Sequence, residues 1–171
     1  MTYVQQPASG PTELDRVYGL RRQYYHLFMA DYNRSIERLD PVLIELCRLR
    51  MATLLQSQHD LSLRYKPAID AGLSETKLRE LSKYQSSPLF SELERRCLEF
   101  AEQFVIQSSN ISDEDVARVQ SVLDAEAFIY FVKALSVMDQ LQRGCAAFDI
   151  RPSGVVPSTM SNFRSTANAI E

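Results

Sequence analysis

The segment spanning residues 40–55 constrains the fold more than any other part of the sequence. Asp40 followed by Pro41 is typical of a helix start, because Asp caps free backbone N–H groups and Pro fits the first helical position. The residues that follow are apolar on almost every side of a helix. Such a helix lies in the centre of a protein, so its charged members must find partners or face a cavity. Those charged members are Glu45, Arg48 and Arg50.

Most of the remaining chain also follows a helical period. Apolar residues recur at helical spacing over residues 12–32, 74–81, 91–105, 112–122 and 125–148. No segment alternates at a period of two for long enough to indicate a sheet. We therefore predict an all-α, single-domain helical bundle of about six to seven helices.

The chain divides into three regions by composition. Residues 1–12 contain Pro and Gly among polar residues and indicate a flexible lead-in. Residues 13–150 form the helical domain, and residues 151–171 read as a loop-like tail, again with Pro and Gly. At 171 residues the chain is long enough for one domain with a sizeable core.

Composition narrows the class of protein. A formal net charge of -3 argues against a general nucleic-acid-binding surface. No apolar run is long enough to span a bilayer, and the first residues lack the pattern of a signal peptide. The three cysteines, Cys47, Cys97 and Cys145, contain no Cys-x-x-Cys pair and are expected to be small buried side chains. We expect a cytoplasmic protein that contacts neither nucleic acid nor membrane.

A second helix is expected directly after residues 40–55. Gln56 breaks the apolar pattern, and Ser57 with Asp60 has the spacing of a capping box at a helix start. Pro67 should interrupt that helix, because it lacks a backbone N–H donor. Gly72 is then expected just beyond the helix end.

Several stretches together resemble the carboxymuconolactone decarboxylase and alkyl hydroperoxidase D-like family. The resemblance runs from about residue 40 to residue 150, and its parts are ELCRLRMATLL, AIDAGLSETKLREL, PLFSELERRCLEFAEQF, SDEDVARV and QLQRGCAAFDI. Their order and spacing are more specific than any one of them. The resemblance implies the helical fold of that family and a site around residues 45–64.

The family motif keeps its spacing here but changes its chemistry. Members carry a glutamate on the first core helix, a Cys-x-x-Cys pair twelve residues later and a histidine one turn on. Glu45 falls on the glutamate position, Ser57 and Asp60 on the two cysteine positions, and Arg64 on the histidine position. His59 matches a histidine of some peroxidase-type members. A dithiol peroxidase needs a thiolate and a resolving thiol, which Ser57 and Asp60 do not supply.

Glu45 and His59 are the candidate catalytic residues. Glu45 is either a desolvated general base or a structural partner of Arg48 or Arg143. His59 would lie in the first turn of its helix, where the helix dipole favours a neutral imidazole suited to acid–base work. A packed or surface histidine is the alternative reading.

Ser57, Asp60 and Arg64 are candidate substrate-binding residues. Ser57 is most simply an N-cap, and Asp60 with Arg64 has the spacing of an ion pair along one helix. Alternatively, Arg64 binds a carboxylate or enolate while Asp60 orients it. A metal site formed by Glu45, His59 and Asp60 is conceivable, but the spacing does not demand it. We expect no metal and no cofactor.

The last long helix offers further candidates. Tyr130 and Arg143 could line the pocket floor and contact substrate, together with Met138, Asp139 and Gln142. Tyr and Met at helical spacing are equally consistent with a plain core.

Three hypotheses for function follow. The first is a small-molecule enzyme that acts on an acidic or phenolic metabolite by thiol-independent acid–base chemistry: decarboxylation, isomerisation or dehydration. The second is a non-catalytic homologue that binds a ligand or protein, and the third is residual alkyl hydroperoxide peroxidase activity. The resemblance also implies a homo-oligomer, a dimer, trimer or hexamer. The aromatic helix with Tyr24, Tyr25 and Phe28 and the tail after Arg151 are candidate packing surfaces.

Overall fold

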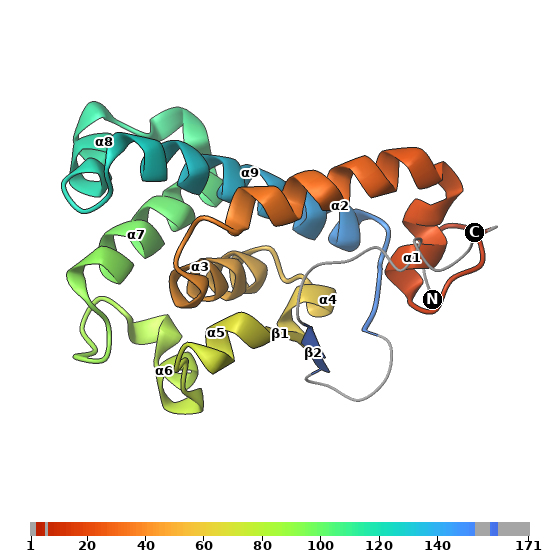
Figure 1. The fold of residues 1–171 in the computed structure, drawn as a ribbon, viewed down its shortest axis with the longest axis horizontal. Helices are drawn as coiled ribbons and strands as arrows, with labels where there is room; N and C mark the ends of the chain where they lie inside the picture. The colour runs from red at the N-terminus through yellow and green to blue at the C-terminus, as the bar shows by residue number, and fades with distance from the viewer. Residues whose placement is uncertain (1–2, 6, 153–157, 161–171) are drawn as a thin grey trace.

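The computed structural model describes residues 3–5, 7–152 and 158–160 of the chain (Figure 1). Helix α3 (Pro41–Leu54) occupies the centre and packs against α7 (Glu92–Gln107) and α9 (Ala125–Ala147). Helix α2 (Arg22–Ile36) runs alongside α9 over the upper side of the view. This arrangement buries α3 from several directions, as its apolar sequence predicts.

The start of α3 forms as the sequence predicts. Asp40 is the N-cap, and its carboxylate accepts a hydrogen bond from the Leu43 N–H at 2.8 Å. Pro41 occupies the first turn, where its missing N–H costs nothing. Nine of the fourteen residues of α3 are buried, including Glu45 and Arg48, two of its three charged residues. Helix α3 therefore places charged side chains in the interior of the protein.

The N-terminal helical region is divided where one helix was expected. It consists of α1 (Glu13–Tyr18), the 3-10 turn η1 (Gly19–Arg21) and then α2. Residues preceding α1 are attached to the domain, because the Tyr3 N–H donates to the Phe148 carbonyl at 3.0 Å. The break at η1 lets α1 turn away from the axis of α2 at the right of Figure 1.

The region after α3 is shorter and more irregular than a single helix. It contains α4 (Gln58–Leu61), the strand β1 (Leu63–Tyr65) and α5 (Lys66–Asp70). Gly72 follows with φ of 98°, so the predicted glycine beyond the helix end is confirmed. Pro67 lies in the first turn of α5, and the predicted interruption falls before it, at β1.

A small parallel sheet joins two distant parts of the chain. β1 pairs with β2 (Ser158–Met160), with Arg64 opposite Thr159. The sequence did not predict these strands, because three residues are too few for a period of two to be visible. The rest of the predicted tail beyond residue 152 lies outside the described residues.

The remaining elements complete the bundle. They are α6 (Glu75–Arg79), η2 (Leu81–Lys83), η3 (Ser108–Asn110) and α8 (Asp113–Gln120). Ser91 and Glu94 form a capping box at the start of α7. The all-α class is confirmed. The described residues contain more helical segments than predicted, because four α-helices are only four to six residues long. Among these residues, no helix has the length and apolarity to cross a bilayer.

Replacing Gln56 with glycine should stabilise the protein. Gln56 has φ of 55° at the end of α3, a left-handed conformation in which a side chain is unfavourable. We expect Gln56→Gly to raise the free energy of unfolding by about 0.5–1 kcal/mol, measured by urea denaturation. Gln120→Gly at the exposed end of α8 is the matched control, and it should lower stability by a similar amount. Destabilisation by Gln56→Gly would contradict this account.

Candidate functional site

The guanidinium of Arg48 is the centre of a buried polar cluster. Arg48 is fully buried, and its Nε and Nη2 atoms donate to the two oxygens of Glu45 at 2.7 and 2.8 Å. This is a bidentate pair, the strongest geometry available to arginine and a carboxylate. Burial by itself lowers the pKa of Arg48, but the charge of Glu45 outweighs it and the pKa is raised. Arg48 therefore keeps its positive charge in the interior.

The same guanidinium fastens α3 to the segment that follows it. Nη1 donates to the Asp60 carbonyl at 2.8 Å and lies 3.4 Å from the Asp60 carboxylate, while Nη2 donates to the Leu63 carbonyl at 2.9 Å. Glu45 in turn accepts a hydrogen bond from the Tyr65 N–H at 3.1 Å. These contacts explain why an irregular α4–β1 segment holds one position against α3.

Asp60 carries the second buried carboxylate. It is completely buried, and its Oδ2 accepts a hydrogen bond from the Ser57 hydroxyl at 2.8 Å. Nδ1 of His59 lies 3.5 Å from the same oxygen. Burial raises the pKa of Asp60, but the hydrogen bond and charge of His59, with Arg48 and Ser57, outweigh it and hold that pKa below its ordinary value. Asp60 is thus a fixed carboxylate beside an imidazole.

His59 lies at the edge of this cluster. Its side chain is 11% exposed, whereas the Asp60 side chain is 1% exposed. Helix α4, which carries it, is a single turn of four residues. The helix-dipole argument for a neutral imidazole therefore has little basis, because so short a helix aligns few peptide dipoles. The electrostatic environment of His59 is set by Asp60 instead.

Cys145 and Tyr18 border the same cluster. Donor atoms of His59, Asp60 and Cys145 lie within 4.8 Å of one another. Burial, with the nearby charge of Asp60, raises the pKa of the Cys145 thiol. Burial also raises the pKa of the Tyr18 hydroxyl, with Cys145 and Asp60 among the contributing charges. A Cβ atom at Gly144 would overlap the Tyr18 hydroxyl, so glycine is what permits this approach.

The His59, Asp60 and Cys145 donors resemble a three-ligand metal set of nitrogen, oxygen and sulfur. The predicted metal alternative used Glu45, which instead pairs with Arg48. Cys145 in such a set would bind as its thiolate, a form that burial disfavours when no metal ion is present.

An apolar groove lies on the outer side of Tyr18. We call it the tyrosine groove; its volume is about 520 Å³ and its lining is Val4, Val17, Tyr18, Leu20, Arg21, Tyr24, Gln140, Gly144 and Phe148. The Tyr18 ring packs on Tyr25 at 5.5 Å and edge-on to Phe148 at 5.9 Å between centroids. Tyr18 thus belongs both to the groove wall and to the surroundings of Asp60 and Cys145.

A second cavity lies between α3, β1 and the α6–η2 region. We call it the arginine cavity; its volume is about 210 Å³ and its lining is Leu49, Arg50, Thr53, Leu61, Arg64, Leu78, Arg79, Leu81 and Ser82. It shares no lining residue with the tyrosine groove. Arg64 lines this cavity from β1. Its Nη1 atom donates to the carbonyls of Leu61 and Leu63 at 3.0 and 2.9 Å, which holds the side chain against the α4–β1 segment.

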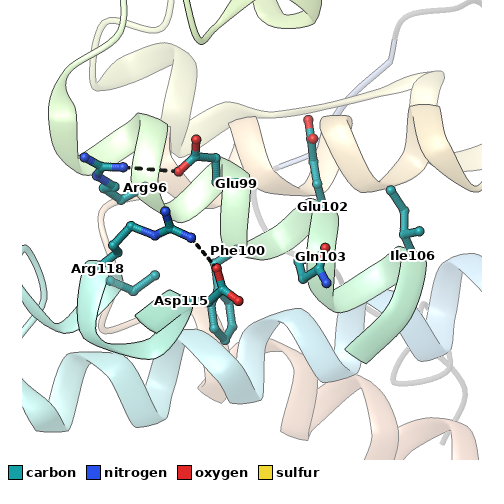
Figure 2. Close-up of a pocket in the computed structure, with 9 residues that line it drawn as sticks. Arg96, Glu99, Phe100, Glu102, Gln103, Ile106, Asp115 and Arg118 are labelled. Atoms are coloured by element: carbon teal, nitrogen blue, oxygen red, sulfur yellow. Dashed lines mark hydrogen bonds and ion pairs between the residues drawn. The ribbon is translucent and has the colours of Figure 1, made fainter. Parts of the chain in front are cut away.

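Figure 2 shows a third cavity, between α7 and α8, of about 280 Å³. Four of its five charged lining residues are paired with one another, and the fifth, Glu102, pairs with Arg50. Arg96 contacts Glu99 at 3.4 Å, and Arg118 contacts Asp115 beside the Phe100 ring. These pairs satisfy the charges locally, so the third cavity offers little unpaired chemistry.

The structure decides between several alternatives left open by the sequence. Glu45 pairs with Arg48, as one alternative predicted, and the Arg143 alternative is wrong. The predicted Asp60–Arg64 ion pair is wrong, because Asp60 faces Arg48 and Arg64 bonds to carbonyls. Ser57 occupies the predicted N-cap position of α4, but its hydroxyl donates to the Asp60 carboxylate and makes no capping bond within the described chain.

Tyr130 and Arg143 lie away from the cluster. The Tyr130 ring lies under Arg38 at 5.5 Å, and twelve helical residues separate it from Gln142, about 18 Å along α9. Arg143 forms a pair with Asp139 at 2.8 Å and donates to the Val105 carbonyl. Gln142 does reach the cluster, because its side-chain amide donates to the Arg48 carbonyl at 3.0 Å.

Sequence reasoning missed three members of the cluster. Arg48 was recognised as a charge needing a partner, but its role as a shared partner of two carboxylates was not. Cys145 and Tyr18 carry no local signal, because a cysteine or tyrosine at helical spacing is ordinarily core. Helix α9 packs against α4, which brings Cys145 near His59, and the charges of Cys145 and Asp60 contribute to raising the pKa of Tyr18.

Comparison with known proteins supports the fold. No protein-family model matches the chain. The uncharacterized protein YnjA of Escherichia coli (strain K12) is 26% identical over 129 residues, which cover 75% of this chain and 71% of the relative.

Three solved structures share the arrangement of helices. A protein of unknown function from Agrobacterium tumefaciens, proposed to be the antioxidant defence protein AhpD, has a TM-score of 0.72 at 18% identity, over 81% of this chain and 96% of that one. An uncharacterized peroxidase-related protein from Silicibacter sp. TM1040 has a TM-score of 0.71 at 15% identity, over 95% and 96%. The chain has the alkyl hydroperoxidase D-like fold.

The third structure is the debrominase Bmp8, in a variant with a cysteine replaced by alanine and in complex with 2,3,4-tribromopyrrole. Its TM-score is 0.72 at 16% identity, over 88% of this chain and 81% of that one. The resemblance stated from the sequence is thus confirmed at the level of the fold, which accommodates more than one chemistry.

The ionised form of Asp60 should make stability depend on acid pH. Because its folded-state pKa lies below the ordinary 3.8, Asp60 adds stability that is complete above about pH 4 and is lost as the pH falls through the folded pKa. We expect Asp60→Asn to flatten the plot of unfolding free energy against pH in this window, measured by urea denaturation. Asp113→Asn on exposed α8 is the control and should leave the slope unchanged. Equal slopes for Asp60→Asn and the unmodified protein would contradict the assignment.

Proposed function

We propose that this protein is an enzyme that moves protons on a small phenolic or acidic metabolite at His59, without a catalytic thiol. The observation that carries the proposal is the contact between His59 Nδ1 and the Asp60 carboxylate, at 3.5 Å. Ser57 and Arg48 also contact the Asp60 carboxylate and hold it in place. An imidazole backed by a fixed carboxylate is a recurrent arrangement for general acid–base catalysis.

The proposed mechanism assigns the two ring nitrogens of His59 different tasks. Nδ1 carries the hydrogen directed at Asp60, which leaves Nε2 to accept a proton from the substrate. The imidazolium that forms is stabilised by the negative charge of Asp60. Returning the proton to another carbon completes an isomerisation, and returning it to a departing hydroxyl group completes a dehydration that releases water. In a decarboxylation the C–CO2 bond breaks, CO2 leaves, and the imidazolium protonates the carbon that remains. The 3.5 Å contact is long for a hydrogen bond, and we expect it to shorten when substrate is bound.

The tyrosine groove is the proposed binding place for the substrate. Its volume of about 520 Å³ and its apolar, aromatic lining suit a small ring-containing molecule. Because burial raises the pKa of Tyr18, its hydroxyl stays protonated at neutral pH and can donate to a phenolate or carbonyl oxygen. Bmp8, which shares the fold, holds a brominated pyrrole. That comparison supports a small aromatic ligand without identifying it.

Other predicted site residues take supporting roles in this proposal. Glu45 holds Arg48, and Ser57 holds Asp60. The catalytic role predicted for Glu45 is not part of the mechanism, because both its oxygens accept hydrogen bonds from Arg48. The mechanism needs no cofactor.

A homo-oligomer and a cytoplasmic location remain predictions. Tyr25 and Phe28, two of the three aromatic residues expected at a subunit contact, are buried within the chain itself. Tyr24 is 51% exposed and continues a stripe on one side of η1 and α2 with Leu20 and Leu27. This stripe is the better candidate for a contact between copies.

A second candidate function is ligand binding without catalysis. The locked Glu45–Arg48 pair favours it, because the glutamate of the motif then serves structure alone. The tyrosine groove would still bind its ligand. Turnover, rather than binding, separates the two candidates.

His59→Gln should abolish turnover while leaving the fold and the groove intact. We expect a loss of about 10²–10⁴-fold, the usual contribution of a general acid–base group. The assay is deuterium incorporation from D2O into a panel of phenolic acids and unsaturated lactones, followed by NMR. The chain has two histidines, so His26→Gln on α2 is a matched control that should retain full activity.

Binding provides the second readout of that experiment. Ligands that perturb Tyr18 fluorescence should do so equally in His59→Gln. Exchange that persists in His59→Gln would defeat the catalytic assignment. Binding to the groove with no exchange in any panel member would favour the non-catalytic candidate.

The protein should lack dithiol peroxidase activity. All three cysteines are buried, and burial raises the pKa of Cys97 to about 12 and those of Cys47 and Cys145 as well. Thiols of this kind form little thiolate at neutral pH. We expect no hydroperoxide turnover above background with a dithiol reductant, and the Cys97→Ser variant should behave identically. Turnover that disappears when one cysteine is replaced would show that the peroxidase reading is correct.

A further inference from the structure

The arginine cavity has an unusual balance of charge. Three of its nine lining residues are arginines, Arg50, Arg64 and Arg79, and none of the nine is acidic. Its other polar residues are the hydroxyl-bearing Thr53 and Ser82. A cluster of cations with hydroxyl groups around a small cavity is suited to an anion.

Ion pairs neutralise only part of this charge. Arg50 pairs with Glu102 on α7. Within the part of the chain that the structure describes, neither Arg64 nor Arg79 has a carboxylate within ion-pair distance, and the Arg79 Nε atom donates to the Glu75 carbonyl at 3.3 Å. Two positive charges therefore face a cavity of about 210 Å³ without a negative partner from the described residues.

The Arg64 guanidinium is held in a defined orientation. Nη1 donates to the carbonyls of Leu61 and Leu63, which fixes the plane of the group. The opposite edge carries Nε and Nη2. Nε is buried and has no hydrogen-bond partner among the described residues. A buried donor without a partner is costly, so an acceptor from a ligand is the natural means of satisfying it.

We propose that the arginine cavity binds a small dianion through carboxylate or phosphate oxygens. The anion accepts from Nη2 of Arg64, and a small rotation of the side chain would bring the enclosed Nε into the side-on geometry of a bidentate arginine pair. Arg79 supplies the second charge, and the cavity volume limits the ligand to a few heavy atoms beyond the anionic group.

This site is separate from the proposed substrate groove but mechanically close to the polar cluster. The Leu63 carbonyl accepts hydrogen bonds from both Arg48 and Arg64, each at 2.9 Å. An anion on Arg64 therefore acts on the same short strand that holds Arg48 and Asp60 in place. The proposal does not depend on catalysis at His59.

Isothermal titration calorimetry with inorganic phosphate and with succinate tests the proposal. The full chain is titrated at constant ionic strength, with chloride as the competing background anion. We expect millimolar or tighter binding of at least one of the two, and preference between them distinguishes a phosphate ligand from a dicarboxylate. Arg64→Gln should weaken that binding by about tenfold or more, because the bidentate contact is lost.

Further variants separate the geometry of Arg64 from its charge. Arg64→Lys keeps the charge but not the planar fork, so it should recover only part of the affinity. Arg34→Gln, on the exposed side of α2, removes the same charge elsewhere and should bind as the unmodified protein does. His59→Gln should also bind normally, which separates this site from the proposed catalytic one.

Two results would overturn the proposal. One is the absence of binding heat for both anions at concentrations well above the millimolar range. The other is binding that Arg64→Gln and Arg79→Gln leave unchanged, which would assign the anion to another surface. Circular dichroism and thermal unfolding of each variant show whether the fold is retained, and the Arg79→Gln variant, at an exposed position, covers the case in which Arg64→Gln does not fold.

Discussion

The polar interior of this protein depends on one arginine shared by two buried carboxylates. Arg48 binds Glu45 through two short bonds and also contacts Asp60 and two backbone carbonyls. A buried ion pair costs desolvation energy that its attraction barely repays, so its value here lies in position rather than in stability. It fixes the irregular segment after α3, on which every candidate site residue from Ser57 to Arg64 is carried. Two carboxylates against one guanidinium leave an excess negative charge, and His59 is the basic group beside it.

That excess charge distinguishes this site from a dithiol site and underlies the acid–base chemistry proposed for it. In the family that the sequence resembles, the positions of Ser57 and Asp60 belong to a cysteine pair. Here a hydroxyl-to-carboxylate hydrogen bond of 2.8 Å joins the same two positions. The replacement turns a redox pair into a fixed negative charge with a lowered pKa. A fixed carboxylate beside an imidazole favours proton transfer, whereas a dithiol favours electron transfer.

Features that depend on the local sequence pattern could be predicted from the sequence, whereas features that depend on tertiary contacts could not. The cap at Asp40, the break at Gln56 and the burial of α3 follow from spacing and propensity alone. The Asp60–Arg64 pair failed because it assumed a continuous helix, and β1 replaces that helix. Strand β1 exists because it pairs with β2, some ninety residues away, which no local pattern reveals. Cys145 was predicted as core, correctly, and its closeness to His59 is a property of how α9 packs on α4.

The sequence predicted acid–base chemistry and anion binding at one site. In the structure the tyrosine groove and the arginine cavity are separate, and they share no lining residue. The sequence placed an anion-binding Arg64 and an acid–base His59 in a single pocket, because they are one to two turns apart on an assumed helix. The strand turns Arg64 toward α3 and η2, while His59 faces Asp60 and the α9 side. The Leu63 carbonyl, bonded by both Arg48 and Arg64, lies between the two regions. A movement of this strand would act on Arg48 through the Leu63 carbonyl and on Glu45 through the Tyr65 N–H, and through Arg48 it would change the support of Asp60. The support of Asp60, and with it the contact between Asp60 and His59, is therefore tied to the position of β1.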